Sequence, residues 1–497
     1  MESKDLKYWQ DRRATLHFEG RAFIDGEYRA SENGKRFDCV SPIDGKVLTE
    51  IAECGASDID VAVAAARRAF EQRVWCGLNP RQRKAILLRW AASIGEHLDE
   101  LALLETLDAG KPVADTTTVD VPGAAYCVQW FAEAIDKSGG EVAPADHHLV
   151  GLVTREPIGV VAAVVPWNFP LLMASWKFAP ALAAGNSVVL KPSEKSPLTA
   201  IRIAQLAHEA GIPAGVFNVV PGTGEAGKQL ALHRDVDCLA FTGSTQVGKL
   251  IMQYAGQSNL KRVWLELGGK SPNIVMPDCP DLDRAAQAAA SAIFYNMGEM
   301  CTAGSRLLVH RDIKATFLDK LLAAARRYQP GNPMDPNTSM GAIVDHAQME
   351  RVLDYIRAGR EEANLIAGGS RVHCDSGGFY IEPTIFDNDK PDARIVREEI
   401  FGPVLSVLTF DTVDEAVRIA NESEYGLAAA VWTSDLATAH DVSRRLRAGT
   451  VWVNCYDEGG DMNFPFGGYK QSGNGRDKSL HALEKYTELK STLIRLQ

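Results

Sequence analysis

The sequence predicts two α/β domains, each built on a parallel sheet, together with a β arm. Short β-branched runs alternate with helical segments between Ile158 and Leu267, and a second alternating block extends from Asn273 to about Val453. Such alternation is typical of parallel strands joined by crossover helices. A polar hairpin from Gly139 to Arg155 and an alternating tail from Tyr486 to Leu496 indicate the arm, which we expect to add a strand to a neighbouring subunit.

The domain boundaries follow from where these patterns change. A chain of 497 residues has room for about three domains. We expect residues 1–138 and 157–266 to form the first domain, residues 267–464 the second, and residues 139–156 and 476–497 the arm.

Individual elements are predicted from periodicity. Apolar residues recur three and four apart from Asp58 to Ala109, which favours helices. The strands expected in the first domain are Val160–Val165, Ser187–Leu190, Phe217–Val220, Leu239–Phe241 and Val263–Leu267. The elements expected in the second domain are the strands Asn273–Met276 and Arg306–His310 and the helices Leu282–Asn296 and Ile313–Arg327. Pro and Gly residues from Gln329 to Gly341 predict a surface loop.

Charge and cysteine usage narrow the class of partner. The chain has 53 Lys and Arg against 64 Asp and Glu, a net charge of −11, which argues against nucleic acid or an acidic membrane surface as the main partner. Nine cysteines lie without CxxC spacing, so we expect neither a disulfide framework nor a metal site. A cationic or neutral small molecule fits this composition better.

We expect neither a leader peptide nor a membrane span. The segment from Met1 to Arg13 is charged and lacks an apolar core. The longest apolar stretch, from Ile158 to Gly185, is interrupted by three prolines and by Lys177. The sequence therefore predicts a cytoplasmic protein.

Two glycine-rich turns are candidates for a phosphate site. Gly222-Thr-Gly224-Glu-Ala-Gly227 matches GxGxxG between an expected strand and helix, but no acidic ribose ligand is clearly placed after it, so a simple glycine turn remains an alternative. The next unit, Phe241-Thr-Gly243-Ser244-Thr-Gln-Val-Gly248, fits better. Gly243 permits close approach, and Ser244 can cap a helix whose first N–H groups bind a pyrophosphate.

An acidic ribose ligand can instead come from Lys191-Pro-Ser193-Glu194, which follows the strand Ser187–Leu190. Glu194 can accept hydrogen bonds from ribose hydroxyls, and its charge would repel a 2′-phosphate. Glu194 therefore favours NAD over NADP, although the nearby positive charge of Lys191 weakens this preference.

Three residues are candidates for catalysis, each with a structural alternative. Cys301 has glycines on both sides that permit substrate approach, but a free cysteine is most often an inert core residue. Glu266 ends an apolar strand and is placed like a base, or it forms a salt bridge with Lys270. Asn168, fixed between two prolines, is an oxyanion donor or an Asx-turn residue.

In this order and combination the motifs resemble the aldehyde dehydrogenase superfamily, from about Phe23 to Glu488. The motifs that carry the resemblance are PWNFP at Pro166, KPSE at Lys191, FTGST at Phe241, ELGGK at Glu266, the Gly298 to Cys301 segment, EEIFGPV at Glu398, YGLAAAVW at Tyr425 and PFGGYKQSG at Pro465. The C-terminal region looks most similar to the γ-glutamyl-γ-aminobutyraldehyde and other ω-aminoaldehyde dehydrogenases of putrescine catabolism.

The resemblance implies a Rossmann-like cofactor domain, a catalytic domain and an oligomerisation arm. It also implies an NAD(P)-dependent oxidation of an aldehyde to an acid through a cysteine thiohemiacetal and thioester. Cys301 would be the nucleophile, Asn168 with the Cys301 backbone N–H the oxyanion hole, and Glu266 the base that activates water. Lys177 and Asp477 match a proton relay from this base.

The resemblance also implies the cofactor contacts, with NAD preferred and NADP as the alternative. The adenosine side is matched by Trp167, Lys191, Ser193 and Glu194, with Gly224 and Gly227 at the adenine. Gly243 and Ser244 match the pyrophosphate turn, and Glu399 and Phe401 match the contacts to the nicotinamide ribose. Further cofactor contacts are expected from Phe241, Gly248 and Leu267. A monovalent cation near Asp108 and Val40 rests on the resemblance alone.

One residue departs from the family pattern. Many members carry Gln two residues before the nucleophile, and this chain carries Glu299. A carboxylate facing the thiol would raise the pKa of Cys301. We expect Glu299 to turn away and bond to backbone or to a cation.

Substrate preference is predicted from two sets of residues. Those matching the aldehyde tunnel of the family are Phe169, Met173, Trp176, Tyr295 and Phe466. Asp457, Glu458 and Asp461 lie in the loop Asn454 to Asn463, where they would attract an amine, unless the loop is simply a solvated acidic surface. We expect an ω-aminoaldehyde, with a broad-range, betaine aldehyde or guanidinobutyraldehyde specificity as alternatives.

Two other functional classes are alternatives to an active dehydrogenase. A catalytically silent structural relative has no need to retain Cys301, Glu266 and Asn168 together. A cysteine hydrolase would need a histidine partner, and none of the 11 histidines lies in these motifs. The arm predicts a homodimer or homotetramer, without a choice between them.

Overall fold

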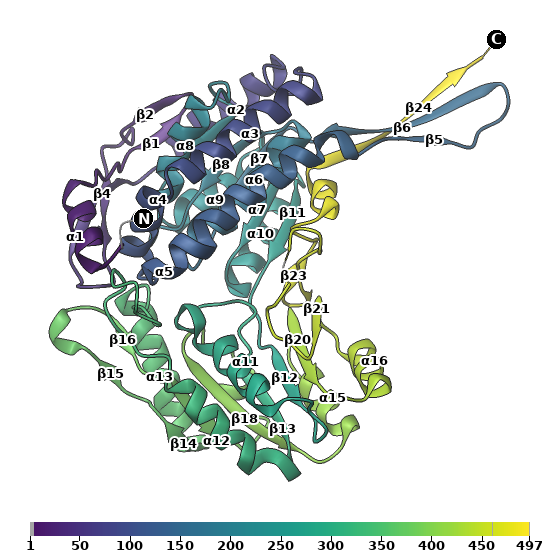
Figure 1. Cartoon of the computed structure of the whole chain (residues 1–497). Coiled ribbons are helices and arrows are strands. Elements are labelled where there is room, and N and C mark those ends of the chain that lie inside the picture. The colour runs from purple at the N-terminus through teal and green to yellow at the C-terminus, as the bar shows by residue number, and fades with distance from the viewer. Residues whose placement is uncertain (1–3, 460, 497) are drawn as a thin grey trace.

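The computed structural model describes residues 4–459 and 461–496. Two sheets with their helices form the two bodies of Figure 1, and a three-stranded arm projects from the side of the upper body. The predicted fold class, two α/β units with parallel sheets plus a β arm, is confirmed. No helix among the described residues is both long enough and apolar enough to span a bilayer.

The first sheet contains the five predicted strands, which run parallel. From one edge to the other its strands are β2 (Glu27–Arg29), β1 (Ala22–Ile24), β9 (Phe217–Val219), β8 (Ser187–Lys191), β7 (Val160–Val164), β10 (Cys238–Thr242), β11 (Arg262–Glu266) and β23 (Gly473–Asn474). The added strands β1, β2 and β23 pair antiparallel at the edges.

Helices cover both faces of this sheet because its strands are apolar on both sides. Ala162 in β7 packs in one core with α2 and α9, while Val161 and Ala163 pack in another with α3, α6 and α7. The helices of this body are α2 (Ala56–Glu71), α3 (Pro80–Glu96), α4 (Leu98–Ala109), α6 (Val121–Ala134), α7 (Pro170–Ala184), α8 (Leu198–Glu209), α9 (Gly224–Leu232) and α10 (Thr245–Gln257).

The second sheet is parallel except for its edge strand β14. Its order is β14 (Asn364–Ala367), β17 (Thr384–Asp387), β18 (Val404–Phe410), β13 (Arg306–His310), β12 (Pro272–Val275), β20 (Ala428–Trp432) and β21 (Thr450–Val453). The helices in the same part of the chain are α11 (Leu282–Phe294), α12 (Lys314–Ala325), α13 (His346–Glu362), α14 (Arg394–Arg397), α15 (Val413–Asn421) and α16 (Leu436–Arg445).

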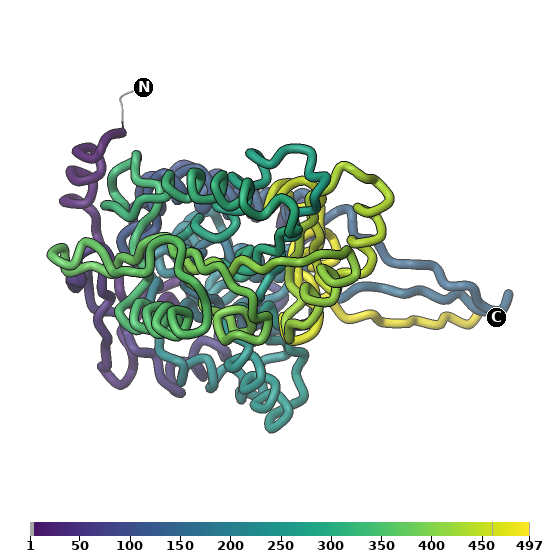
Figure 2. Tube along the Cα trace, turned by 90° about the horizontal axis from the view of Figure 1, so that it is seen from below, coloured from purple at the N-terminus to yellow at the C-terminus, as the bar shows by residue number. Residues whose placement is uncertain are grey.

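The arm and several short elements complete the fold. The arm is an antiparallel sheet in which β6 (Leu149–Pro157) lies between β24 (Thr487–Arg495) and β5 (Glu141–Ala143), and Figure 2 shows it extending away from the body. The remaining elements are α1 (Leu6–Thr15), α5 (Val113–Asp115), the pairs β3–β4 (Arg36–Val40, Val47–Ala52), β15–β16 (Arg371–Val372, Tyr380–Ile381) and β19–β22 (Tyr425–Gly426, Tyr469–Lys470), and the short helical turns Thr116–Asp120, Ile135–Lys137, Tyr295–Gly298, Arg311–Ile313, Cys374–Ser376 and Leu480–Tyr486.

Two local predictions need correction. The helix predicted to reach Asn296 ends at Phe294, because Asn296 and Met297 have φ values of 47° and 55°, outside the helical region. The predicted surface loop from Gln329 to Gly341 is only partly on the surface, since Met340 is buried in the second core.

The relative placement of the two sheets positions the site. Asn168, Gly243 and Glu266 lie at the carboxyl ends of β7, β10 and β11, and parallel strands bring such ends to one edge. Cys301 and Glu399 precede the amino ends of β13 and β18 in the second sheet. The pocket described next is lined from both edges.

Candidate active site

A pocket of about 710 Å³ lies between the two sheets, a volume typical of ligand sites. Its lining joins residues from the carboxyl edge of the first sheet with residues that precede strands of the second. The predicted residues that line it are Asn168, Cys301, Trp167, Gly243, Ser244, Leu267, Glu399, Phe401, Phe169, Met173, Trp176, Tyr295, Asp457, Glu458, Asp461 and Phe466.

The segment that carries Cys301 is held by close backbone contacts. Gly298 has a φ of 72°, and a Cβ there would lie 2.3 Å from the Gly402 carbonyl oxygen. A Cβ on Gly269 would lie 2.3 Å from the Cys301 carbonyl oxygen. The Tyr456 hydroxyl donates to the Thr302 carbonyl at 2.7 Å. The glycines are therefore required by packing, and the nucleophile segment has a defined path.

The surroundings of Cys301 oppose its ionisation. Burial raises the pKa of Cys301 well above its usual value, and the nearby carboxylates of Glu266 and Glu399 raise it further. A hydrogen bond from the Thr302 backbone N–H acts in the opposite direction. In the absence of other groups Cys301 is therefore a thiol at neutral pH, and its attack on a carbonyl requires proton removal.

Glu266 is a buried carboxyl group without the salt bridge that the sequence left open. Within residues 4–459 and 461–496, no ion pair joins Glu266 to Lys270, and Glu266 Oε1 and Lys270 Nζ have no hydrogen-bond partner. Burial raises the pKa of Glu266 well above its usual value, and Asp477 adds to the effect, while Lys177 opposes it. A carboxylate held in this way is a stronger base than one in water.

Lys177 and Asp477, for which a relay role is predicted, are hydrogen-bonded to each other, and a third residue joins them. Asp477 accepts hydrogen bonds from both Lys177 and Lys485, and all three side chains are buried. Burial opposes ionisation of Asp477, but the two lysines outweigh it and lower the Asp477 pKa. Lys485 was not predicted, since it lies in a short helical turn with no local motif.

Asn168 is held by a distant segment and does not form a local turn. Its side-chain Nδ2 donates to the Glu299 carbonyl at 2.8 Å. The Asn168 carbonyl in turn accepts from Lys111 Nζ and from Asn296 Nδ2, each at 3.1 Å. An amide nitrogen carries two hydrogens, so the bond to Glu299 uses one of them.

Glu299 turns away from the thiol, as predicted. Its Oε1 accepts from the Val344 backbone N–H at 3.2 Å. Burial raises its pKa well above the usual value, and the hydrogen bond from the Val344 N–H opposes this shift.

One side of the pocket has the features of a dinucleotide site. Ser244 caps α10, its Oγ accepting from the Val247 N–H at 3.3 Å. A Cβ on Gly243 would meet the Phe241 ring at 2.4 Å, so only glycine fits there. Glu399 Oε1 accepts from the Gly269 N–H at 2.9 Å, and burial raises the Glu399 pKa to about 7.

Other predicted residues lie outside the lining of this pocket. On the adenosine side, Lys191 Nζ bonds Glu194 Oε2 at 3.2 Å beyond the end of β8. The residues not found in the lining are Lys191, Ser193, Glu194, Gly224, Gly227, Phe241, Gly248, Glu266, Lys177 and Asp477. The adenosine and adenine contacts remain predictions.

The opposite side of the pocket is aromatic and ends in charged residues. Trp176 and Phe466 pack edge to face with ring centroids 5.2 Å apart. Glu458 is paired with Arg284 at 3.0 Å, so its charge is largely compensated. Asp457 is an exposed residue that lines the pocket, and desolvation of its carboxyl group by the surrounding protein atoms raises its pKa.

Two cations that line this pocket were not predicted from the sequence. Lys478 lines the pocket, and its Nζ lies 4.6 Å from the centroid of the Trp176 ring and 5.7 Å from that of Phe466. Arg351 of α13 also lines the pocket and donates to the Glu399 carbonyl at 3.0 Å. The sequence around Lys478 and Arg351 does not show that either side chain points into the pocket. The only indication was that Lys478 directly follows Asp477.

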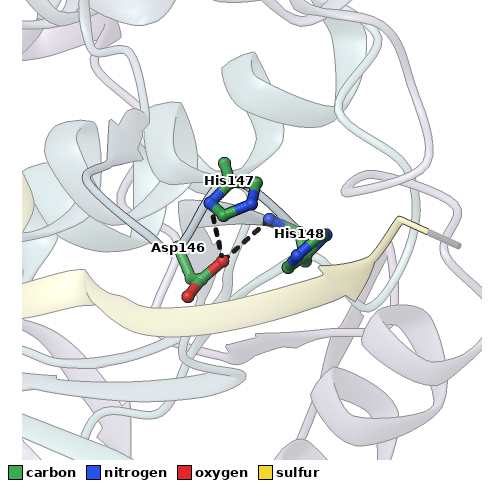
Figure 3. Close-up of side chains that lie close together, drawn as sticks. All are labelled: Asp146, His147 and His148. Atoms are coloured by element: carbon green, nitrogen blue, oxygen red, sulfur yellow. Dashed lines mark hydrogen bonds and ion pairs between the residues drawn. The ribbon is translucent and has the colours of Figure 1, made fainter.

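One group of side chains among the described residues has the composition of a metal site. Asp146, His147 and His148 lie at the turn between β5 and β6, where their ligand atoms approach within 4.8 Å of one another (Figure 3). All three are exposed. Asp146 Oδ1 already accepts from the His148 N–H at 3.0 Å and lies 3.3 Å from His147 Nδ1, as in an ordinary polar turn.

Comparison with known proteins identifies the family. The model of the aldehyde dehydrogenase family matches residues 28–492. The chain belongs to the aldehyde dehydrogenase family. It is therefore an oxidoreductase, as the resemblance implied.

Several relatives of this dehydrogenase are similar over their whole length. The NADP/NAD-dependent aldehyde dehydrogenase PuuC of Escherichia coli is 54% identical over 498 residues, which cover 100% of each chain. The crystal structure of a gamma-glutamyl-gamma-aminobutyraldehyde dehydrogenase from Burkholderia cenocepacia has 80% identity and a TM-score of 0.98, covering 99% of this chain and 100% of that chain. An indole-3-acetaldehyde dehydrogenase solved with NAD+ has 61% identity and a TM-score of 0.98, with the same coverage.

Proposed function

We propose that this dehydrogenase uses NAD to oxidise an ω-aminoaldehyde to the carboxylic acid, with γ-glutamyl-γ-aminobutyraldehyde or a 4-aminobutyraldehyde-like compound as substrate. The observation that carries the proposal is that Cys301 and Asn168 share one pocket with Ser244 and Glu399 on one side and Asp457 on the other. The names of two similar proteins, PuuC and the 80% identical γ-glutamyl-γ-aminobutyraldehyde dehydrogenase, support it.

The residues on the Ser244 side fit a dinucleotide. The N-terminus of α10 provides backbone N–H groups for a pyrophosphate, and the Glu399 carboxylate can accept hydrogen bonds from a ribose. A Cβ on Gly268 would lie 2.2 Å from Glu399 Oε2, so Gly268 allows the carboxylate to lie against the chain. The chemistry that NAD supplies when bound is uptake of a hydride from the substrate carbon.

Cys301 and Asn168 act on the carbonyl group. The Cys301 thiol gives its proton to Glu266, the sulfur then forms a bond to the aldehyde carbon, and the carbonyl oxygen becomes an oxyanion. The Asn168 amide hydrogen that does not bond to Glu299, together with the Cys301 backbone N–H, donates to this oxygen. After oxidation the substrate is a thioester of Cys301.

Glu266 completes the reaction by removing a proton from water, whose oxygen attacks the thioester carbon. The bond to sulfur breaks, and the acid and the thiol are released. Lys177, Asp477 and Lys485 form a buried network whose charges act on the pKa of Glu266, and we assign this network the onward transfer of the proton.

The charged end of the tunnel sets the substrate preference. Asp457 and Lys478 act on each other's pKa, and we expect this pair to bind a group that carries both charges, with Asp457 toward the ammonium and Lys478, beside Trp176, toward the carboxylate. A γ-glutamyl group carries both an ammonium and a carboxylate, so this pair of charges favours the γ-glutamylated aldehyde over the free amine.

The experiment is NADH formation across γ-glutamylated, free amino, guanidino and plain aldehydes, comparing the parent with Asp457→Asn. We expect the substitution to raise KM for amine-bearing aldehydes by about tenfold, equal to roughly 1.4 kcal/mol, and to leave a neutral aldehyde of equal length unchanged. Glu458→Gln is the matched control, because Arg284 already pairs with Glu458. Equal changes for all aldehydes contradict the proposed specificity, and no turnover of any aldehyde contradicts the proposed activity.

A second candidate substrate is an aryl acetaldehyde. It is favoured by the aromatic lining of the tunnel and by the name of the 61% identical indole-3-acetaldehyde dehydrogenase. The same panel separates the two, because an indole carries no ammonium and its KM would not respond to Asp457→Asn.

We also propose that the first sheet with its helices is the NAD-binding domain, that residues 267–464 form the catalytic domain, and that the arm joins copies of this chain into a homodimer or homotetramer. Exposed Leu489 and Leu493 on β24, 61% and 69% accessible, support the last point. Apolar side chains on a projecting strand are typical of a surface that is covered in an assembly.

A further inference from the structure

Three ionisable residues outside the proposed mechanism are buried directly behind Asn168. Glu105 and Asp120 are fully buried, and Lys111 is 1% accessible. Lys111 Nζ donates to Asp120 Oδ1 at 2.6 Å. The same nitrogen donates to the Asn168 carbonyl at 3.1 Å and lies 3.5 Å from the centroid of the Phe169 ring.

Burying these groups is costly, and the site compensates for it. Burial raises the pKa of Glu105 well above its usual value, and the charge of Asp120 adds to the effect. Lys111 and Asp120 then form one ion pair in an environment where an unpaired charge costs several kcal/mol. A buried ion pair is weak evidence for a stabilising role. The contacts of Lys111 described above point to a different role.

The backbone of Lys111 is fixed by the other half of the molecule. Gly110, which ends α4, has a φ of 77°, and its carbonyl accepts from the Ala342 N–H at 3.0 Å. A Cβ on Gly341 would lie 2.0 Å from that carbonyl oxygen, so the two segments are in direct contact. Lys111 therefore reaches Asn168 from a fixed position.

We propose that Lys111 is a positioning residue that holds the Asn168 backbone so that its side-chain amide points at the developing oxyanion. The contacts on Asn168 form a frame: Lys111 and Asn296 bind its carbonyl, and the Glu299 carbonyl binds its amide. Loss of the ammonium group frees one side of this frame. This inference rests on the proposed oxyanion role of Asn168.

The test compares two reactions of Cys301 in the full-length enzyme without NAD. Acylation by p-nitrophenyl acetate develops an oxyanion and is followed by release of p-nitrophenolate. Alkylation by iodoacetamide develops none and is followed by mass spectrometry of the Cys301 peptide. For Lys111→Met we expect the ratio of acylation to alkylation rates to fall about tenfold, less than the roughly 100-fold loss typical when an oxyanion donor is removed outright.

Matched variants make the outcome specific. Lys261→Met removes another buried lysine, whose Nζ donates to the Ala231 carbonyl at 2.6 Å, and it should leave the ratio unchanged. Asn168→Ala should lower the ratio more than Lys111→Met does, and the double variant should lower it no further. Asp120→Asn removes the anion bound to Lys111 at nearly constant side-chain volume. It should lower the ratio of acylation to alkylation less than Lys111→Met does. It replaces Lys111→Met in the test if that variant does not fold.

The positioning role is overturned if Lys111→Met and Asp120→Asn lose acylation and alkylation equally, or lose neither. This holds as long as Asn168→Ala still lowers the ratio of acylation to alkylation. If Asn168→Ala leaves the ratio unchanged, the proposed oxyanion role of Asn168 fails instead. The two failures are therefore distinguishable.

Discussion

The Cys301 thiol lies among acidic groups that oppose its ionisation. Burial and the charges of Glu266 and Glu399 raise its pKa, so the thiolate is scarce near neutral pH. A carboxylate this close to the thiol has two opposed effects. It can accept the proton of the thiol, but its negative charge disfavours the thiolate.

Replacing Glu266 separates these effects. In Glu266→Gln the negative charge is absent at every pH, so the pKa of Cys301 falls and the alkylation rate by iodoacetamide reaches half its maximum at a lower pH than in the parent. Loss of the base slows thioester hydrolysis, and we expect kcat to fall by about 100-fold or more. A burst of NADH equal to the number of sites, followed by slow turnover, is the measurement. An alkylation profile that moves to higher pH contradicts the assignment.

Among the single residues of the site, the local sequence identified those whose neighbours in the chain are unusual. Cys301 lies between glycines and Asn168 between prolines, and both line the pocket. Lys111 and Lys478 had no such context, because their functions depend on folded neighbours. Lys111 is 57 positions away from Asn168, whose carbonyl it binds, and no periodicity encodes that distance.

Single elements support the pocket through close backbone contacts, and the turn after α11 is the clearest case. Asn296, Met297 and Gly298 all have positive φ values, an arrangement that costs energy in residues with a Cβ. The contact of Gly298 with Gly402 joins this turn to the segment that carries Glu399 and Phe401.

Gly298→Ala should destabilise this contact. The added Cβ would lie 2.3 Å from the Gly402 carbonyl at a left-handed backbone position, and we expect a loss of about 2 kcal/mol or more in unfolding free energy together with reduced kcat. Thermal and denaturant unfolding give the measurement. Gly256→Ala is the control, since nothing lies within 4 Å of a Cβ there and alanine favours the helix. Equal stability of the two variants would refute the prediction.

Regular elements were predicted closely because a buried parallel strand reads as a continuous β-branched run. The run Val160–Val165 corresponds to β7 (Val160–Val164), and Arg306–His310 matches β13. The end of α11 was missed, since two consecutive left-handed residues without glycine carry no sequence signal. The two-residue strand β23 was missed because it is too short to show alternation.

At the scale of the whole molecule, the fold determines which strands are neighbours, and no single segment of the sequence specifies this. β12 pairs with β20 although Asn273 and Ala430 are far apart in the sequence, and the carboxyl edge of one sheet meets the amino edge of the other only after both have formed. The sequence could predict two sheets and an arm, but not that Cys301 and Asn168 would lie in one pocket, except through the family resemblance.

The arm should control assembly at this scale. We expect the parent to have a mass that is a multiple of 54.0 kDa by light scattering after gel filtration, and the double variant Leu489→Asp, Leu493→Asp to shift toward the monomer, since charge on an apolar contact is costly. Thr492→Asp, one residue from Leu493 on the opposite face of β24, is the control and should keep the parent mass. A parent that elutes as a monomer would contradict the proposed assembly.

The strand β24 ends at the outer end of the arm, where the Leu496 N–H donates to the His148 carbonyl at 2.7 Å (Figure 1). A peptide tag fused to the carboxyl terminus would therefore begin at the point where copies of the chain are expected to meet, and it would hinder their association. The helix α1 (Leu6–Thr15) lies on the side of the molecule away from the arm (Figure 1), so a tether attached near α1 would keep clear of the arm.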